Sequence, residues 1–343
     1  MESKCPNCGG ALNFDTESQK LKCPHCDGTF DVDSFKEESG YTIENENFDG
    51  KEDLVTYTCN SCGGVIITDK NTVATKCPYC LNPVYLSGKV EGGYKPSRVI
   101  PFKYDKNQAK EAFYNFLKKK VLIPNNFNDE AIISEIKGIY VPYWLFNGTA
   151  NAKIWYDATK TRMWSDGDYN YTETSIYKLF RSGRVSFKDV PVDASSNVPD
   201  ELTESIEPFD TVEAKEFNPN YLAGYMADKY DVSVEESQKI ASSRISNSTI
   251  SMFNSTTIGY STCISTNSNV FLSDTKQEYV MYPLWLLNIK YNDEIYTFAM
   301  NGQTGKMVGK LPTDKGKFYK YMFAILAISF IIITLIQFLI IKL

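Results

Sequence analysis

The chain has 343 residues, enough for about two or three domains with at least one hydrophobic core. It carries 36 Lys and Arg against 42 Asp and Glu, and this net charge of −6 argues against a protein whose main task is to neutralise nucleic-acid phosphates. The single histidine, His25, excludes most catalytic schemes that rest on a histidine base. The 23 Tyr and 20 Phe favour strand-rich packing.

Eight of the nine cysteines form two units of one spacing, with two residues inside each C-x-x-C pair and 14 residues between the pairs. The first unit contains Cys5, Cys8, Cys23 and Cys26, and the second contains Cys59, Cys62, Cys77 and Cys80. The units superimpose at an offset of 54 residues, which indicates tandem duplication of one module. No apolar run precedes the first pair, so we expect cytosolic, metal-binding cysteines and not disulfides.

The spacing suits Zn²⁺, which binds four thiolates in a tetrahedron, two from each tight C-x-x-C turn. The sequence therefore predicts two zinc ribbons, at residues 1–30 and 54–90, each closed around one structural Zn²⁺. Two residues after the second cysteine of each pair stands a residue type that tolerates a positive φ, which such a turn requires. These positions are Gly10, Gly28, Gly64 and Asn82. Because four thiolates leave no open coordination position, the predicted sites are structural and not catalytic.

Two other arrangements of the cysteines stay open. In one, the first and third pairs share a metal, although the equal spacers and the 32-residue gap between the units favour sequential sites. In the other, the pairs are redox dithiols, but no βαβ pattern of the thioredoxin kind surrounds them. His25 lies inside a pair that already supplies its thiolates, and we expect it to be a surface residue.

The charge of the N-terminal quarter of the chain indicates whether the ribbons bind nucleic acid or protein. Residues 1–90 carry 8 Lys against 14 Asp and Glu, and the acidic linker at residues 31–53 alone has nine acidic residues and two lysines. Binding to nucleic acid requires a basic face, and this segment lacks one. We therefore expect protein recognition or simple structural stapling, and no nucleic-acid ligand.

Residues 321–341 form an uncharged apolar run, long enough to cross a hydrocarbon core about 30 Å thick as a helix. The segment before it, residues 312–320, is basic, and only Lys342 follows the run. The positive-inside rule then predicts a single-pass protein of the cytoplasmic membrane with its N-terminal domains in the cytoplasm. A buried core helix is the alternative, although this segment is apolar on every face.

The middle of the chain, residues 94–311, is predicted to be an α+β domain with antiparallel sheets. A capping aspartate, Asp105, begins one amphipathic helix, and a capping box at Ser233 and Glu236 begins a second one that runs toward Phe253. Four segments are typical of strands: "GIYVPYWLF", "NAKIWYDAT", "EYVMYPLWLLNIKY" and "EIYTFAMN".

A weaker internal repeat lies in this domain. "VPYWLFN" at residues 141–147 matches "YPLWLLN" at residues 282–288, and each copy follows a helical segment and precedes a second strand. We interpret this as a duplicated unit of one helix and one antiparallel hairpin. The shared Pro-x-Trp is predicted to be a packing device, because proline can begin or border a strand and tryptophan buries a large ring.

The sequence gives no sign of an enzyme. "GQTGKMVGK" lacks the loop length and the Ser or Thr of a phosphate-binding loop, and fits a hairpin turn better. The acidic stretch at residues 164–175, with Asp166, Asp168 and Glu173, could bind Ca²⁺ or supply paired carboxylates, but a solvated hairpin loop explains it as well. Cys263 has no activating neighbour in sequence and is expected to be a small, partly buried residue.

Taken together, the motifs carry a resemblance to a family. The cysteine units, "YVPYWLF", "WSDGDYNYTET", "SIEPFD", "YLAGYMADKYDV" and "YTFAMNGQTGKMVGKLP" resemble a bacterial family of TFIIB-type zinc-ribbon membrane proteins, the YdjG-like proteins, over nearly the whole chain. Members are sometimes mislabelled as primosomal helicases, and this chain lacks the ATPase motifs for that label. The resemblance implies all eight zinc ligands, and a role at the bacterial cytoplasmic membrane near PspA-like and flotillin-like (SPFH) proteins in envelope stress.

The sequence thus predicts a non-enzymatic scaffold or adaptor, tethered to the membrane by its tail, that recruits cytosolic protein partners and takes no small-molecule substrate. The alternative is a membrane-bound regulator whose ribbons contact nucleic acid or the transcription machinery. A third class, an enzyme that uses the acidic stretch at residues 164–175, would require a metal-dependent activity.

Overall fold

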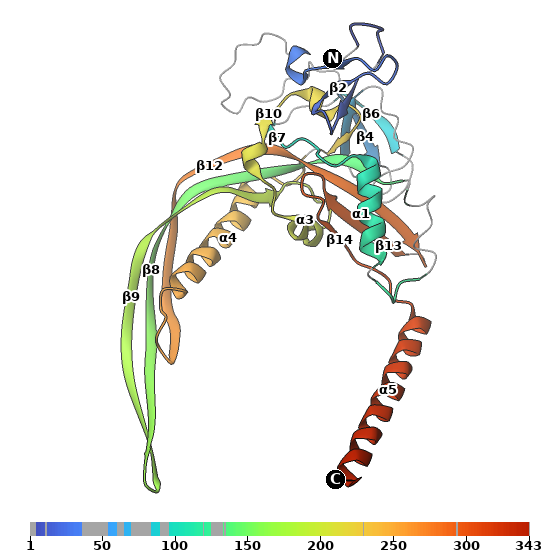
Figure 1. Ribbon diagram of the computed structural model, residues 1–343. Coiled ribbons are helices and arrows are strands. Elements are labelled where there is room, and N and C mark those ends of the chain that lie inside the picture. The colour runs from blue at the N-terminus through green and yellow to red at the C-terminus, as the bar shows by residue number, and fades with distance from the viewer. Residues whose placement is uncertain are drawn as a thin grey trace.

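The computed structural model describes residues 5–10, 12–35, 54–59, 65–69, 84–89, 96–118, 120–124, 133, 135–228, 230–292 and 294–342. The chain is an α+β protein made mostly of sheet (Figure 1). A small N-terminal sheet in the order β1-β2-β3 consists of β1 (Asn13–Asp15), β2 (Lys20–Lys22) and β3 (Thr29–Phe30), and the short 3₁₀ helix η1 (Val32–Phe35) follows it. Both neighbouring pairs of this small sheet are antiparallel.

One large sheet of 11 strands forms the rest of the β structure, in the order β10-β7-β12-β8-β11-β5-β4-β6, with β9 paired to β8 and β13 and β14 added beyond β12. Its strands are β4 (Leu54–Cys59), β5 (Val65–Asp69), β6 (Val84–Lys89), β7 (Arg98–Val99), β8 (Lys137–Asp166), β9 (Tyr169–Asp193), β10 (Lys215–Glu216), β11 (Met226–Asp228), β12 (Thr262–Tyr291), β13 (Glu294–Asn301) and β14 (Met307–Gly309). Most neighbours are antiparallel, while β11 pairs with β8 and β7 pairs with β12 in parallel.

The two predicted helices of the middle domain are confirmed. Helix α1 (Lys106–Lys118) begins after Asp105, whose carboxylate accepts from the N–H of Gln108 at 2.7 Å, and it buries Ala109, Phe113 and Leu117 at a spacing of four residues. Helix α4 (Val234–Asn254) begins at the predicted capping box, because the Ser233 hydroxyl accepts from the N–H of Glu236 and the Glu236 carboxylate accepts from the N–H of Ser233.

A further short helix, α3 (Asp200–Ile206), and two 3₁₀ helices, η3 (Thr211–Glu213) and η4 (Pro219–Leu222), lie in the connection between β9 and α4. The core occupies both faces of the large sheet. Helix α1 packs with one cluster, which contains a set of aromatic rings, and α3 packs with the other. In the first cluster, Phe102 stacks on Tyr225 with ring centroids 4.2 Å apart and meets Tyr140 and Trp285 edge to face.

Both tryptophans of the Pro-x-Trp repeat pack in the core, as the sequence predicted for a packing device. Trp144 on β8 donates its indole N–H to the carbonyl of Val232, and Trp285 on β12 donates its indole N–H to the carbonyl of Tyr104. Each repeat lies on a long strand that follows a helix and precedes an antiparallel partner. The origin of the two units by duplication stays a prediction.

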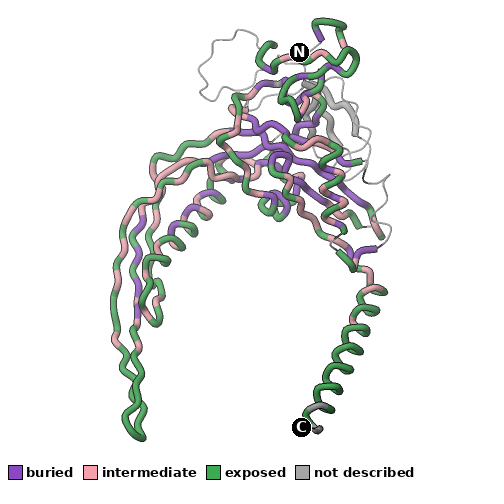
Figure 2. Tube along the Cα trace, in the orientation of Figure 1, coloured by how far each residue is buried: buried purple, intermediate pink, exposed green. Residues whose placement is uncertain are grey.

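Strands β8, β9 and β12 extend far past the body of the protein (Figure 1). We call this extension the arm and define it as residues 149–166, 169–186 and 262–273. The sequence suggested separate strands at residues 138–146 and 151–159, whereas one strand, β8, runs through both segments. Helix α4 covers one face of the arm, where Ala152, Ile154 and Tyr156 are buried against its Ile250 and Phe253 (Figure 2). Beyond that helix the arm is exposed on both faces.

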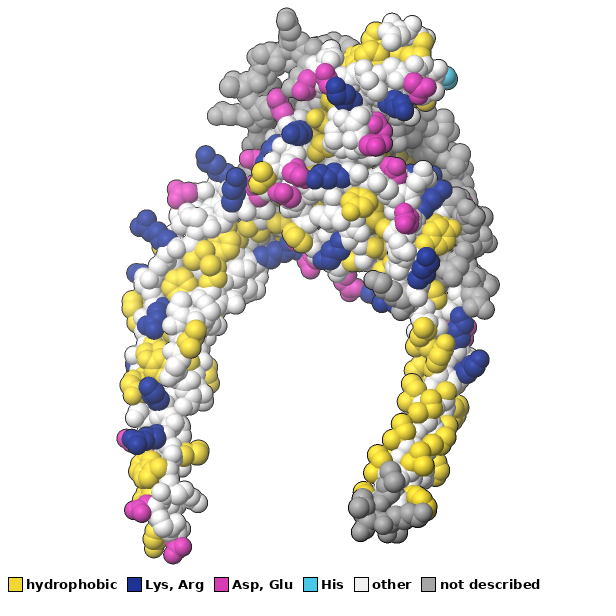
Figure 3. All heavy atoms as spheres, viewed as in Figure 1, with side chains coloured by type: hydrophobic (Ala, Val, Ile, Leu, Met, Phe, Trp, Pro, Cys, Tyr) yellow, Lys and Arg dark blue, Asp and Glu magenta, His cyan; other side chains and the backbone are white. Residues whose placement is uncertain are grey.

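The C-terminal helix α5 (Lys315–Lys342) leaves the body as a separate rod. The most apolar window of its segment Lys315–Phe338 has a mean hydropathy of 2.3, and no part of that window is buried. Hydrophobic side chains cover the face of this helix that Figure 3 shows. The helix is therefore long and apolar enough to cross a membrane. The alternative of a buried core helix is wrong, because none of that window lies inside the protein.

Candidate metal centre

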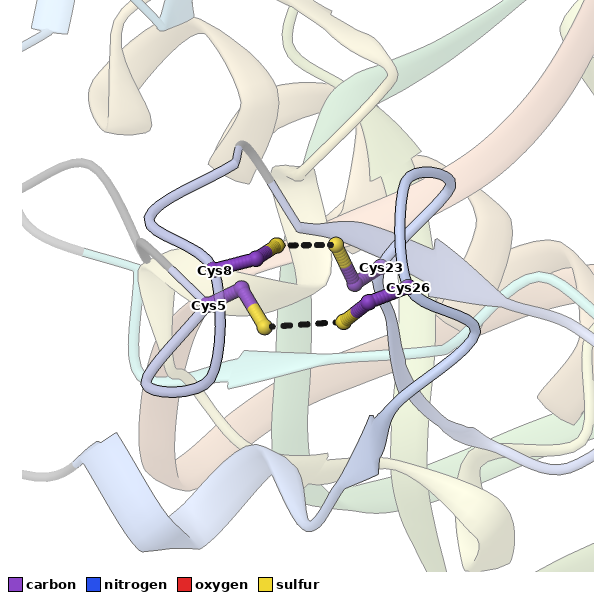
Figure 4. Close-up of side chains that lie close together, drawn as sticks. All are labelled: Cys5, Cys8, Cys23 and Cys26. Atoms are coloured by element: carbon purple, nitrogen blue, oxygen red, sulfur yellow. Dashed lines mark hydrogen bonds between the residues drawn. The ribbon is translucent and has the colours of Figure 1, made fainter.

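The cysteines of the first unit converge on one point (Figure 4). The sulfur of Cys5 lies 3.4 Å from that of Cys26, the sulfur of Cys8 lies 3.5 Å from that of Cys23, and all four sulfurs lie within 4.8 Å of one another. Four thiolates at tetrahedral positions about 2.3 Å from Zn²⁺ would lie roughly 3.8 Å apart. The arrangement therefore fits a tetrahedral metal ion held by two knuckles.

Each knuckle is a tight turn closed by the backbone. The N–H of Cys5 donates to the carbonyl of Gly10 at 2.7 Å, and the N–H of Cys23 donates to the carbonyl of Gly28 at 2.9 Å. The predicted positions of positive φ are wrong by one residue, because Gly9 (φ 74°) and Asp27 (φ 54°) take that conformation in the first unit. They directly follow the second cysteine of each pair, where the turn reverses.

Gly10 is required for a different reason, namely close approach. A Cβ at this position would lie 2.7 Å from the ring carbon Cδ2 of His25 and 3.5 Å from the sulfur of Cys23. His25 itself is exposed, as predicted for a surface residue. Gly64 and Asn82, the two equivalent positions of the second unit, lie outside the described residues.

The environment of the sulfurs favours ionisation of one thiol. Burial opposes ionisation of Cys23, but the backbone N–H groups of His25 and Cys26 donate to its sulfur, and its pKa falls to about 6. The pKa of Cys26 rises to about 12, because the neighbouring sulfurs of Cys5 and Cys8 outweigh a hydrogen bond from the backbone of Gly28. A divalent cation removes this conflict, since it binds all four groups as thiolates.

Among the described residues, these four cysteines are the one group of three or more His, Cys, Asp or Glu whose ligand atoms come this close together. In the second unit, Cys59 ends strand β4, while Cys62, Cys77 and Cys80 lie outside the described residues. The strands of that unit, β4, β5 and β6, continue the large sheet, and β5 pairs with β11 through Ile67 and Ala227.

The first unit is docked onto the body, which the sequence did not indicate. Its Leu12, Phe14 and Leu21 are buried in the same core cluster as Phe102 and Trp285. The side-chain amide of Gln19 donates to the carbonyl of Phe102 at 2.8 Å, and the N–H of Phe14 donates to the carbonyl of Ala223 at 3.1 Å.

A second contact holds the end of the unit. The side-chain amides of Asn218 and Asn220 both donate to the carbonyl of Val32, at 3.3 and 3.2 Å. Both asparagines flank the proline that begins η4, and both are buried. The Asn-Pro-Asn sequence is a local signal only for a turn, in which the side chain of Asn218 accepts from the N–H of Asn220, and it does not indicate the contact with Val32.

The other candidate residues stay apart from the metal centre. Asp166 and Asp168 flank the turn of the β8–β9 hairpin at the exposed tip of the arm, and Glu173 lies opposite Arg162. None of these three carboxylates belongs to a metal-ligating group in the described part of the chain. Cys263 is partly buried on β12 opposite Ala158, as expected for a small packing residue.

These features define a class, a β-rich protein with a four-cysteine centre at one end and an apolar helix at the other. The chain is 34% identical to the uncharacterized protein YdjG of Bacillus subtilis (strain 168) over 334 residues, which cover 97% of this chain and 96% of the relative. The chain therefore belongs to the YdjG family. No family model matches it, and no solved structure does.

Proposed function

We propose that the protein is a non-enzymatic, membrane-tethered adaptor of the TFIIB-type zinc-ribbon kind that holds cytosolic protein partners at the bacterial cytoplasmic membrane. The observation that carries the proposal is the placement of the four-cysteine unit on the body, at the opposite end from α5 (Figure 1). With α5 in the bilayer and the lysines at its start on the cytoplasmic side, the cysteine unit would lie in the cytoplasm. Binding at the membrane then raises the effective concentration of the partners.

Two structural Zn²⁺ ions, one for each cysteine unit, belong to this proposal. In the first unit Cys5, Cys8, Cys23 and Cys26 would hold the ion, and in the second Cys59, Cys62, Cys77 and Cys80 would do so. A bound ion fixes the two knuckles together, and the docking contacts through Gln19, Asn218 and Asn220 fix the unit to the body. The ribbon and the body then offer one rigid, composite surface.

The orientation follows from the charges at the start of α5. Lys315, Lys317 and Lys320 precede the uncharged run, and Phe318 and Tyr319 lie among them with exposed rings. Lysines on the cytoplasmic side and aromatic rings at the interface are the usual arrangement for a single span. The resemblance to YdjG-like proteins suggests PspA-like and flotillin-like proteins as partners in envelope stress.

Crosslinking in living cells, followed by affinity purification of the full chain, tests the adaptor role. The wild-type chain is compared with Cys23→Ser, which removes a buried ligand, and with Cys263→Ser, which removes a cysteine outside both units. We expect a set of cytosolic proteins that the wild type and Cys263→Ser retain and that Cys23→Ser loses. If all three chains retain the same proteins, or none, the adaptor role of the ribbon is wrong.

A further inference from the structure

Both edges of the arm are open. Strand β8 lies in the middle, β9 pairs with it on one side and β12 on the other, and no other described strand pairs with β9 or with residues 262–273 of β12. Every second residue of an edge strand turns its N–H and C=O away from the sheet. The arm thus exposes two long rows of unsatisfied backbone groups in each copy of the protein.

The β12 edge lacks most of the features that usually protect such an edge. Residues 262–273 contain no proline and no charged residue, although proline and lysine are the usual means of blocking edge-to-edge pairing. One bulge interrupts the strand at Thr266, and the stretch from Asn267 to Ser273 then pairs with β8 without a break. An uninterrupted, uncharged edge is a template for another strand.

The β9 edge has a different character, because it is cationic. Lys178, Arg181 and Arg184 lie within a short stretch of it, and Asp157 on β8 pairs with Lys178 at 2.6 Å. Contact between two β9 edges would bring the same cations together, which is unfavourable. Contact between a β9 edge and the uncharged β12 edge avoids this repulsion. It also gives the backbone N–H and C=O groups on both edges of every arm a hydrogen-bonding partner.

We propose that copies of this chain associate side by side through their arms, with the β12 edge of one copy paired to the β9 edge of the next. Because β8 is antiparallel to both neighbours, β9 and β12 run in the same direction, and the contact between copies is parallel. Such a contact is heterologous, so it continues from copy to copy and yields a row or a closed ring.

The rungs of the arm fix the expected register. Cys263 lies opposite Ala158, and Ala158 lies opposite Tyr177, so these three residues form one rung and share one face of the sheet. If neighbouring copies are related by a shift perpendicular to the strands, the rung continues into the next copy. Cys263 of one copy then lies beside Tyr177 of the next. The same rule places Ser268 beside Arg181, because both lie opposite Ile154.

Parallel pairing leaves all copies in one orientation. Copies anchored in the same membrane by α5 must share one orientation, and this step rests on the proposed membrane anchoring. An antiparallel contact between two equal edges would turn one copy around an axis perpendicular to the strands. The side-by-side arrangement needs no such turn, however the arm stands relative to the bilayer.

A disulfide between copies tests the contact directly. In Tyr177→Cys, the new cysteine and the native Cys263 of one copy are separated by β8, at about 9–10 Å for two strand spacings. Because a disulfide requires Cα atoms closer than about 7 Å, this pair can form only between copies. Oxidation of membranes that contain the full-length variant should give a ladder of dimers, trimers and longer species, which reductant collapses to monomer.

Four matched variants decide the outcome. Ile176→Cys, the neighbouring residue on the opposite face, should give no ladder above the wild-type level, and Tyr177→Cys combined with Cys263→Ser should give none. On the Tyr177→Cys chain, Ser268→Lys should reduce the ladder several-fold by placing a lysine beside Arg181, whereas Ser268→Glu should preserve it. Circular dichroism of each purified chain checks that the fold is intact.

The proposal is overturned if folded Tyr177→Cys chains in the membrane give no ladder. It is equally overturned if the ladder persists without Cys263, or if Ile176→Cys gives as much of it. Separation of the same cells into membrane and soluble fractions tests the anchoring on its own. A chain found in the soluble fraction contradicts the proposed function, while an absent ladder from anchored chains contradicts the contact between copies.

Discussion

The first cysteine unit and the arm obtain their structure in opposite ways. The strands of the cysteine unit are only two or three residues long, and side-chain groups hold them. The four sulfurs lie at one end of the unit. At the other end lies the seam, by which we mean the buried contact of Leu12, Phe14 and Leu21 with the core cluster around Phe102. The arm is part of three strands of 25 to 30 residues, and it is held mainly by the backbone ladder between them, with one helix on part of one face.

This difference shows where substitutions should matter. In the docked region, a buried side chain contacts several elements at once, so its loss leaves a cavity or an unsatisfied group. In the arm, most side chains face solvent, and single changes should have small effects on folding. The arm is therefore free to vary for binding, whereas the docked region is constrained by packing.

The largest expected effect is the loss of an aromatic ring from the seam. Phe102→Ala removes the ring that stacks on Tyr225 and meets Tyr140 and Trp285, and we expect it to lower the free energy of unfolding by about 3–5 kcal/mol. Phe271→Ala, on the exposed face of the arm, should lower it by less than about 0.5 kcal/mol. Urea denaturation of both purified chains measures this. Equal losses would contradict the comparison.

The next effect concerns the metal. Because Cys23 is fully buried and shares the core cluster of the body, Cys23→Ser or chelation should destabilise the body as well as the ribbon, by on the order of 3 kcal/mol. Cys263→Ser should leave stability nearly unchanged. Thermal unfolding, followed by near-ultraviolet circular dichroism of the core aromatic residues, separates the two. If the body unfolds at the same temperature with and without metal, the cysteine unit does not contribute to the stability of the body, and this prediction is wrong.

A smaller effect should follow from the hydrogen bonds of the seam. Asn218→Ala removes a buried amide that donates to Val32, and we expect a loss of about 1–2 kcal/mol together with faster proteolysis of the N-terminal unit. Asn269→Ala on the exposed β12 edge is the control and should change neither quantity. Limited proteolysis with mass spectrometry locates the first cleavage. Cleavage first in the arm of Asn218→Ala would refute the assignment of this contact.

The pH dependence of stability provides another comparison. The pKa of Asp193 is raised to about 8, mainly because its carboxyl group is buried and in smaller part because Asp200 and Asp228 lie nearby, while the N–H of Ser195 offsets only part of this rise. The folded state therefore retains a proton that the unfolded state loses near pH 4, so stability should fall between about pH 4 and 8, by up to roughly 1 kcal/mol per pH unit.

Asp193→Asn should remove most of this decline, and Asp168→Asn at the tip of the arm should preserve it. Urea titrations at pH 6 and pH 8 measure the difference for each chain. The same decline in Asp193→Asn as in the wild type would assign the effect to other groups, of which Glu207 is the first to test, because burial raises its pKa to about 7.

The smallest effect belongs to the tip of the arm. Trp164 stacks on Tyr171 with ring centroids 5.5 Å apart, and the guanidinium of Arg162 lies 5.5 Å from the Trp164 ring. Trp164→Ala should cost only about 0.5–1 kcal/mol, because the pair is largely exposed. Hydrogen exchange should then rise in the hairpin tip alone. A change that spreads to α4 would show that the arm folds as one unit.

Local chemistry determined which parts of the fold could be predicted from the sequence. The cysteine cluster follows from ligand spacing, α1 and α4 follow from their caps and apolar faces, and α5 follows from an uncharged run. The arm could not be predicted, because residues 160–175 alternate among threonine, charged and aromatic residues without one buried face. Only the pairing of β8 with β9 reveals it. The docking seam joins Gln19 to Phe102, 83 residues apart, through a contact that has no sequence pattern.

The most direct test of the central claim, that the protein holds cytosolic partners at the membrane, is to locate those partners with and without α5. Proteins that crosslink to the full chain are quantified in membrane and soluble fractions, in cells that carry either the full chain or a chain that ends at residue 314. We expect the partners to move from the membrane to the soluble fraction in cells with the shortened chain, and still to bind that chain. Partners that stay at the membrane when α5 is removed would contradict the claim.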